Sequence, residues 1–124
     1  MDIVITTIRR IQAADEFGAT FAHPDSVAEE TIFTFDPAGS RTEIVGIWLD
    51  LFNLTQGATI RTKHMIDGVN FRTFDVLVWA PAMEDGVYIT GFNVRDQIQV
   101  TIQSAVLEGV ARNIPYYYLY RTVE

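Results

Sequence analysis

The amino-acid sequence predicts an all-β protein, an antiparallel β-sandwich of jelly-roll type with seven or eight strands. Isoleucine, valine and threonine together make up 38 of the 124 residues. Such β-branched side chains pack well on pleated sheets but lose rotamer freedom in helices. Turn-forming residues break the chain at short intervals, at positions 36–40, 56–57, 67–68, 84–86 and 109. Breaks at this spacing are typical of a sandwich or a barrel.

The first sixteen residues follow a pattern of their own. Val4, Ile8 and Ile11 recur at the spacing of one helical face. Ile3 and Ile5, in contrast, alternate as residues of a strand do. Both a short helix and an extended arm fit this segment.

The chain therefore divides into an N-terminal helix or arm over residues 1–16 and a single β-sandwich domain over residues 17–124. Within the domain, residues 17–28 are expected to form a loop or a single helical turn. Strands follow from the β-branched and aromatic runs between the breaks. They are predicted at 31–35, 42–54, a hairpin over 60–75, 87–92, 97–103 and 116–123.

The clearest local signal is the pair Asp67-Gly68. An Asp-Gly pair tolerates the positive φ angles of a type I′ turn, which matches the twist of the flanking strands. A two-residue turn here places His64 opposite Phe71, provided that no bulge intervenes. His64 is then expected to pack against its cross-strand neighbours.

Two further strands differ in their hydrophobic pattern. Over residues 97–103, apolar residues alternate with polar ones, which predicts an antiparallel strand with one face in solvent. Residues 42–54 are apolar on both faces and indicate a central strand or one covered on both sides. Pro115 is expected at the entrance of the last strand, because proline cannot donate to a sheet ladder.

Charge and cysteine content exclude several classes of protein. Nine Lys and Arg stand against 16 Asp and Glu, for a net charge of −7, and the pI is about 4.6. No basic face for a nucleic acid is evident, and no apolar run approaches the ~20 residues that cross a bilayer. Without cysteine there is no disulfide, thiolate zinc site or cysteine nucleophile. The N-terminus has the reverse charge order of a secretory signal, so we expect a cytoplasmic product.

The search for catalytic chemistry yields no candidate. His23 and His64 do not form a metal-binding pair, and no serine stands in a nucleophile motif. Adjacent carboxylates in loops are typical of a solvated face. We therefore predict no catalytic residue, no cofactor and no resident metal, and do not expect an enzyme, while calcium at the loop acids stays open. His23 is expected to be a solvated loop histidine.

The most unusual segment is Pro115-Tyr-Tyr-Tyr-Leu-Tyr120. On a strand, Tyr116, Tyr118 and Tyr120 share one face. Tyrosine combines a large contact area with a polar tip, which suits interfaces as well as the rim of a sandwich. Trp48 and Trp79 are expected in the core.

Two motifs carry a resemblance to a known group of proteins. These are Ile-Asp-Gly-Val-Asn-Phe-Arg at 66–72 and Gly-Val-Ala-Arg at 109–112, before the aromatic strand. Over about residues 40–122 the chain resembles small β-sandwich structural or accessory proteins, decoration- or tail-associated, of tailed phages and related viral elements. The resemblance implies a β-sandwich in a virion or assembly setting, with the host cytoplasm and then the virion as its location. It implies no catalytic residue.

Together these observations predict a non-enzymatic structural protein that forms a homo-oligomer or joins a larger protein shell. Neither nucleic acid nor membrane is an expected partner. Candidate interface residues are Val4, Ile8, Ile11, Tyr116, Tyr118 and Tyr120. The alternative is a carbohydrate- or ligand-binding module that uses an exposed tyrosine strip. A third hypothesis, a small enzyme, requires a pocket that joins a histidine to a carboxylate.

Overall fold

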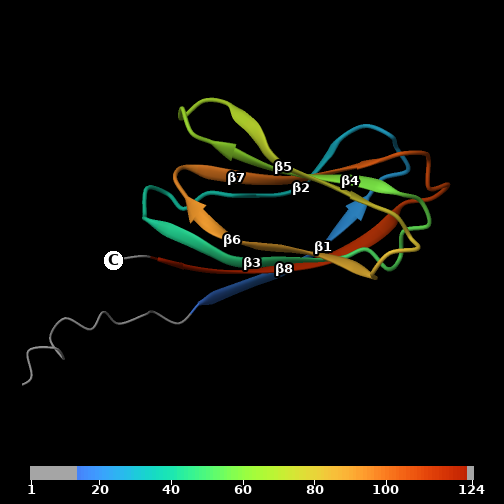
Figure 1. Cartoon of the computed structure of the whole chain (residues 1–124), viewed down its shortest axis with the longest axis horizontal. Helices are drawn as coiled ribbons and strands as arrows, with labels where there is room; N and C mark the ends of the chain where they lie inside the picture. Colours follow the sequence, from blue (N-terminus) through green and yellow to red (C-terminus); the bar gives the residue numbers. More distant parts are fainter. Residues whose placement is uncertain (1–13, 123–124) are drawn as a thin grey trace, which may run out of the picture.

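The computed structural model describes residues 14–122, which fold into two four-stranded antiparallel sheets packed face to face (Figure 1). Sheet A has the strand order β1-β8-β3-β6, and sheet B has the order β2-β7-β4-β5. The strands are β1 Asp15–His23, β2 Glu30–Phe35, β3 Thr42–Asp50, β4 Ala58–Met65, β5 Phe71–Trp79, β6 Gly86–Val94, β7 Gln97–Ser104 and β8 Arg112–Thr122. The predicted antiparallel β-sandwich is confirmed. The described residues contain no helix that is long and apolar enough to cross a membrane.

The chain changes sheet at almost every connection. The connection from β4 to β5 stays within sheet B. All the other connections between consecutive strands lead from one sheet to the other. This order is that of a jelly roll, which combines two Greek keys. The edge strands are therefore β1 and β6 in sheet A, and β2 and β5 in sheet B.

The hydrophobic core lies between the inner faces of the two sheets. Strand β7 follows the predicted alternation, and its Ile98, Val100 and Ile102 are fully buried. Ile47 and Leu49 of β3 face them from sheet A with almost no exposed surface. Burying side chains of this kind stabilises the fold by about 1.5–3 kcal/mol each.

Strand β1 corrects the expectation of a loop over residues 17–28. It begins at Asp15, inside the predicted N-terminal segment, and pairs along its whole length with β8. The sequence of β1 has no clean alternation, so its strand conformation depends on pairing with β8 rather than on local pattern. Val4, Ile8 and Ile11 lie outside the described residues, and so does the choice between helix and arm.

The β4–β5 hairpin has a longer turn than the predicted one. Five residues, rather than two, connect the strands. Asp67 Oδ1 accepts the backbone N–H groups of the two residues that follow Gly68, at 2.9 and 2.8 Å, and Gly68 has a φ of 80°. These bonds stabilise a wider loop, and His64 therefore lies opposite Arg72 and not Phe71.

The sequence predicted Pro115 at the entrance of the last strand, but in the structure Pro115 lies inside β8. It pairs with Thr20 of β1, whereas the pairing of β8 with β3 starts at Tyr116. The missing N–H of proline thus falls where β8 has a neighbour on one side only. Proline is tolerated in a sheet at such a position.

Candidate interaction surfaces

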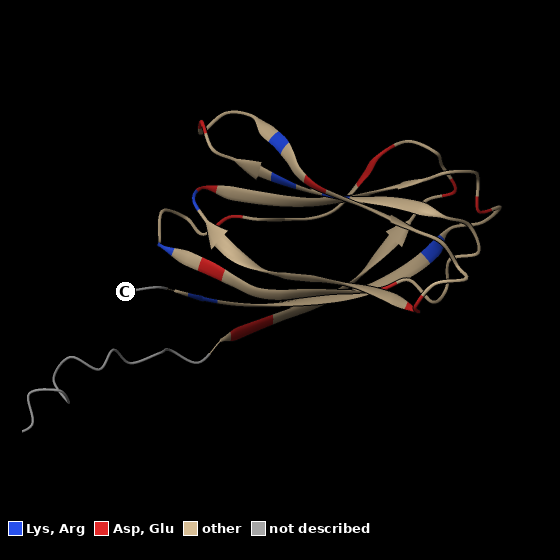
Figure 2. Cartoon of the chain, in the orientation of Figure 1, with Lys and Arg blue, Asp and Glu red and all other residues tan. Residues whose placement is uncertain are grey.

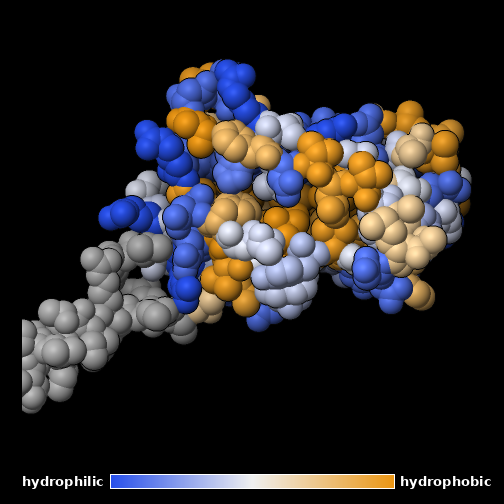
Figure 3. All heavy atoms as spheres, in the orientation of Figure 1, coloured by the Kyte–Doolittle hydropathy of each residue, from blue (hydrophilic) through white to orange (hydrophobic). Residues whose placement is uncertain are grey.

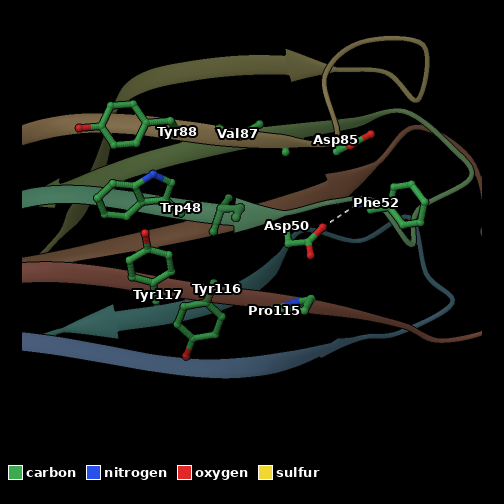
Figure 4. Close-up of a pocket in the computed structure, with 11 residues that line it drawn as sticks. Trp48, Asp50, Phe52, Asp85, Val87, Tyr88, Pro115, Tyr116 and Tyr117 are labelled. Carbon is green, nitrogen blue, oxygen red and sulfur yellow. Dashed lines mark hydrogen bonds between the residues drawn. The ribbon is translucent and has the colours of Figure 1, made fainter.

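A row of three aromatic side chains crosses the outer face of sheet A (Figure 4). Trp48 of β3 lies opposite both Tyr88 of β6 and Tyr117 of β8. The Trp48 and Tyr117 rings stack, with centroids 4.5 Å apart and planes 5° apart, and the Tyr88 ring lies 4.9 Å from Trp48. Tyr88 is 52% exposed and Tyr117 is 37% exposed. The aromatic row therefore offers a large surface to a partner.

A groove of about 640 Å³ lies beside the aromatic row (Figure 4). Its floor is the next row of the sheet, where Asp50 pairs with Gly86 and where β8 contributes Pro115. Gly86 has no side chain to fill this space, and a Cβ there would lie 2.4 Å from the carbonyl oxygen of Leu49. Phe52, which is 70% exposed, stands on the side away from the aromatic row. The shape of the groove therefore depends on the close approach of the backbone at Gly86 as well as on the side chains around it.

The charged residues of the groove are both acidic. Of the 11 described residues that line it, Asp50 and Asp85 carry charge. Asp50 Oδ1 accepts the N–H of Phe52 at 3.0 Å, and the main-chain carbonyl of Asp85 accepts the N–H of Leu51 at 2.9 Å. These bonds fix both residues beside the groove, which suits a partner that combines apolar and cationic groups.

The three tyrosines predicted as interface candidates lie on the inner face of β8. Tyr118 is buried, and Tyr116 and Tyr120 pack against the same core. Tyr116 and Tyr118 stack on Phe33 of sheet B, with ring centroids 5.1 and 4.7 Å apart. Burial raises the pKa of Tyr118 to about 12 and also raises the pKa of Tyr116. The expectation of an exposed strip at these positions is therefore wrong.

The sequence predicted a different place for Trp48 and did not single out the other two residues of the exposed aromatic row, Tyr88 and Tyr117. Because Tyr116 and Tyr118 point inward, Tyr117 between them points outward. Trp48, expected in the core, is half-buried on the outer face. The signal that could have found it is the two-sided apolar pattern of residues 42–54, since one face of that strand had to lie outside the core.

Strand β5 forms an exposed apolar edge of sheet B. Val76, Leu77 and Val78 are 53%, 40% and 69% exposed, whereas Trp79 is buried as predicted. Phe74 is an extra residue where the register with β4 shifts, and its ring is also exposed. Figure 3 shows apolar atoms in the middle of the face where β5 runs in Figure 1. Among the strands of residues 14–122, β5 pairs with β4 alone, so the N–H and C=O groups of its other edge have no partner in the described sheets.

Both histidines have structural surroundings. His23, expected in a solvated loop, is the last residue of β1 and fully buried, with Nε2 2.6 Å from Oγ of Ser104. His64 packs against Phe74 and Phe92, with ring centroids 5.0 and 4.8 Å apart. Burial lowers the pKa of each histidine. Within residues 14–122, no hydrogen bond joins either of them to a carboxylate.

A buried carboxylate, Glu108, connects the loop after β7 to the loop before β4. Glu108 accepts the N–H and the hydroxyl of Thr55 and the N–H of Gln56 at 2.8–2.9 Å, and the Nε of Arg112 lies 3.4 Å away. Burial alone raises the pKa of Glu108, but these hydrogen bonds outweigh it and lower that pKa. The residues described here include no group of three His, Cys, Asp or Glu that could hold a metal ion.

Figure 2 shows that the acidic residues are spread over the sandwich and its loops instead of forming one patch. Two of the cations, Arg61 and Lys63 of β4, lie 3.7 and 2.7 Å from the same carboxylate of Glu29. Thr101 also donates its hydroxyl to this carboxylate at 2.5 Å. Glu29 thus offsets part of the positive charge of Arg61 and Lys63 on the outer face of sheet B.

Comparison with known proteins identifies the fold. No family model and no curated protein matches the chain. Among solved structures, it is similar to a chain of the disulfide-linked pili that form Bacillus endospore appendages, with a TM-score of 0.56 and 16% identity over 90% of this chain and 88% of that one. It is also similar to a chain of the acidic stable capsid of Helicobacter pylori bacteriophage KHP30, with a TM-score of 0.52 and 12% identity over 88% and 93%. At these identities the likeness shows a shared fold.

Proposed function

We propose that this protein is a non-enzymatic structural subunit that assembles with copies of itself into a larger protein shell or fibre. The observation that carries the proposal is the second half of the edge strand β5, where the exposed Val76, Leu77 and Val78 make both faces apolar. An exposed, apolar edge is a template for pairing with another strand. A second copy of the chain is the partner that is always present.

The end of β5 lacks the features by which monomeric proteins protect an edge. Residues 76–79 read Val-Leu-Val-Trp, with no charge and no proline. The charged residues of the strand, Arg72 and Asp75, precede this segment, and so does the bulge at Phe74. Charges, prolines and bulges are the usual means of preventing edge-to-edge pairing. The unprotected segment therefore favours addition of a strand.

The other edge strands allow the contact to propagate. Each sheet has two different edges, so β5 of one copy can pair with a different edge of the next. Contacts between unlike surfaces generate closed rings or open fibres. The chain contains no cysteine, so disulfide bonds between its copies cannot hold such an assembly.

The similar solved structures support the proposal, since one is a pilus and the other a capsid. The motifs at 66–72 and 109–112 favour a phage or a related viral element as the source. We therefore propose a virion-associated subunit that resides in the host cytoplasm before assembly and in the virion afterwards. The glycan-binding alternative has lost its main support, because Tyr116, Tyr118 and Tyr120 face the core.

The proposal is tested by adding charge to the edge. Val76 and Val78 lie opposite Arg61 and Thr59 on the outer side of the sheet, so lysine at both positions is compatible with folding. We expect the V76K/V78K double variant to form much smaller species in sedimentation velocity than the native chain does at concentrations where the native chain is assembled. Val110→Lys, at a loop valine of similar exposure, is the control and should assemble normally. A V76K/V78K variant that assembles like the native chain contradicts the proposal.

A further inference from the structure

We propose that the groove on sheet A of one copy binds the N-terminal segment, residues 1–13, of a second copy. The inference rests on the proposed function, because it names a second contact between assembled copies. The two contacts use different surfaces, the outer face of sheet A and the β5 edge of sheet B. Each can therefore fail without the other.

The groove has the shape and lining that an extended apolar segment requires. Trp48 and Tyr88 line one side of the groove, and Phe52 lines the other. The floor between them is formed by Gly86, which has no side chain, and by the compact ring of Pro115. Aromatic-lined grooves bind extended segments through the faces and edges of their rings. A groove of about 640 Å³ is large enough to take several side chains.

Residues 1–13 have the complementary composition. Their branched aliphatic side chains are Ile3, Val4, Ile5, Ile8 and Ile11. The segment also contains two arginines against one aspartate, whereas residues 14–122 contain seven Lys and Arg against 14 Asp and Glu. The N-terminal segment is thus the cationic part of an acidic protein.

The charges of the segment and the groove match. Arg9 and Arg10 are adjacent to apolar residues, and the charged residues of the groove are Asp50 and Asp85. A guanidinium bound there can pair with a carboxylate while it contacts an aromatic ring. Both interactions favour arginine, and both strengthen when the site is shielded from water.

The direction of β1 favours the groove of a second copy over the groove of the same copy. Asp15, where β1 begins, pairs with Tyr120, and β8 places Pro115 of the groove five residues away, about 17 Å along the sheet. Strand β1 runs toward the groove, so its first residue, Asp15, lies at the end of the strand that is farther from the groove of the same copy. Thirteen residues can span about 45 Å, which exceeds the length of the strands and suffices to reach a neighbour.

A charge-reversal experiment on the full chain tests this contact. We expect the R9E/R10E variant and the Asp85→Arg variant each to associate about tenfold more weakly than the native chain in concentration-dependent light scattering. An equimolar mixture of the two should regain association, because the acidic segment of one can bind the altered groove of the other. Glu84→Arg is the matched control. Glu84 is the exposed neighbour of Asp85 and does not line the groove, so this variant should associate as the native chain does.

The outcomes separate this inference from the proposed function. Normal association of R9E/R10E, or a mixture that stays as weak as its components, overturns the inference. If V76K/V78K then loses assembly, the proposed function stands alone. If the native chain is monomeric at every concentration, both fail. Tryptophan fluorescence of the R9E/R10E chain gives a second test. The inference is also overturned if adding a glycan changes this fluorescence and adding a synthetic peptide of residues 1–13 does not.

Discussion

Trp48 and Tyr117 stack across β3 and β8 with their ring planes 5° apart, on the face of sheet A that points away from the core. On either side of Tyr117 along the chain, Tyr116 and Tyr118 point inward and stack on Phe33 of the opposite sheet. Consecutive tyrosines of one strand thus contribute to two different surfaces. The inner ones join the two sheets, and the outer one is available to a partner.

The stacked pair should be energetically coupled. Alanine substitutions of Trp48 and Tyr117, made singly and together, should reveal a coupling free energy of about 0.5–1.5 kcal/mol in urea unfolding. The same cycle with Trp48 and Phe52 is the control, because Figure 4 places Phe52 on the far side of the groove. Additive effects in the first cycle would show that the stacking does not contribute to stability.

Two glycines in sheet A should respond differently to an added methyl group. A Cβ at Gly86 meets the backbone oxygen of Leu49 at 2.4 Å, whereas a Cβ at Gly46 meets the side chain of Tyr88 at 2.7 Å. Backbone moves less easily than an exposed side chain, so Gly86→Ala should destabilise by about 2–3 kcal/mol and Gly46→Ala by less. Gly46→Ala should instead change the fluorescence of Trp48, through the displaced Tyr88. Thermal and chemical unfolding measure the first effect, and the reverse order of stability would contradict the contact geometry.

Stability should decrease in mildly acidic solution because of the two histidines. Burial lowers the pKa of His23 and of His64 in the folded state, whereas in the unfolded chain they titrate near pH 6.5. As the pH falls below about 6.5, the unfolded chain therefore binds protons that the folded chain does not, and the free energy of unfolding drops by up to about 1.4 kcal/mol per pH unit for each histidine. Urea unfolding at pH 7.5 and 5.5 measures this loss. The H23Q/H64Q variant should show a much smaller difference between the two pH values, and an equal difference would assign the effect to other groups.

Glu108 should contribute strongly to stability. Its buried carboxylate accepts three hydrogen bonds and lies beside Arg112. Glu108→Gln leaves donors without an ionised acceptor and should cost about 2–4 kcal/mol. Because its folded pKa is lowered, the stabilisation is present above the unfolded pKa of about 4.3 and is lost as the pH falls through the folded value. Exposed Glu84→Gln serves as the reference, and equal unfolding free energies for the two variants would contradict this role.

Periodicity was sufficient to predict the fold class and most of the strands. The alternation over 97–103 describes β7 correctly, because one face of this strand is core and the other is polar. Strand β1 could not be predicted in the same way, since its conformation depends on β8, which lies almost a hundred residues later in the chain. The turn at Asp67 is longer than predicted. The Asp67 carboxylate accepts hydrogen bonds from two backbone N–H groups, and these bonds stabilise a wider loop.

The interaction surfaces were harder to predict than the fold. The sequence shows that Tyr116, Tyr118 and Tyr120 share a face, but which face is buried depends on the packing of Phe33 in the other sheet. The exposure of β5 likewise depends on sheet order, which makes it an edge. An apolar run such as residues 76–79 is equally typical of a central strand, so the sequence alone does not show that this run lies at an exposed edge.

Hydrogen exchange at two protein concentrations tests the central claim most directly. Amides of β5 that face away from β4 have no partner among the eight strands that the structure describes, so they should exchange rapidly in dilute solution. At concentrations where the chain assembles, we predict slower exchange over residues 71–79 of the native protein and unchanged exchange in V76K/V78K. Assembly of the native chain with equally fast exchange in β5 at both concentrations would contradict the claim that this edge joins the copies.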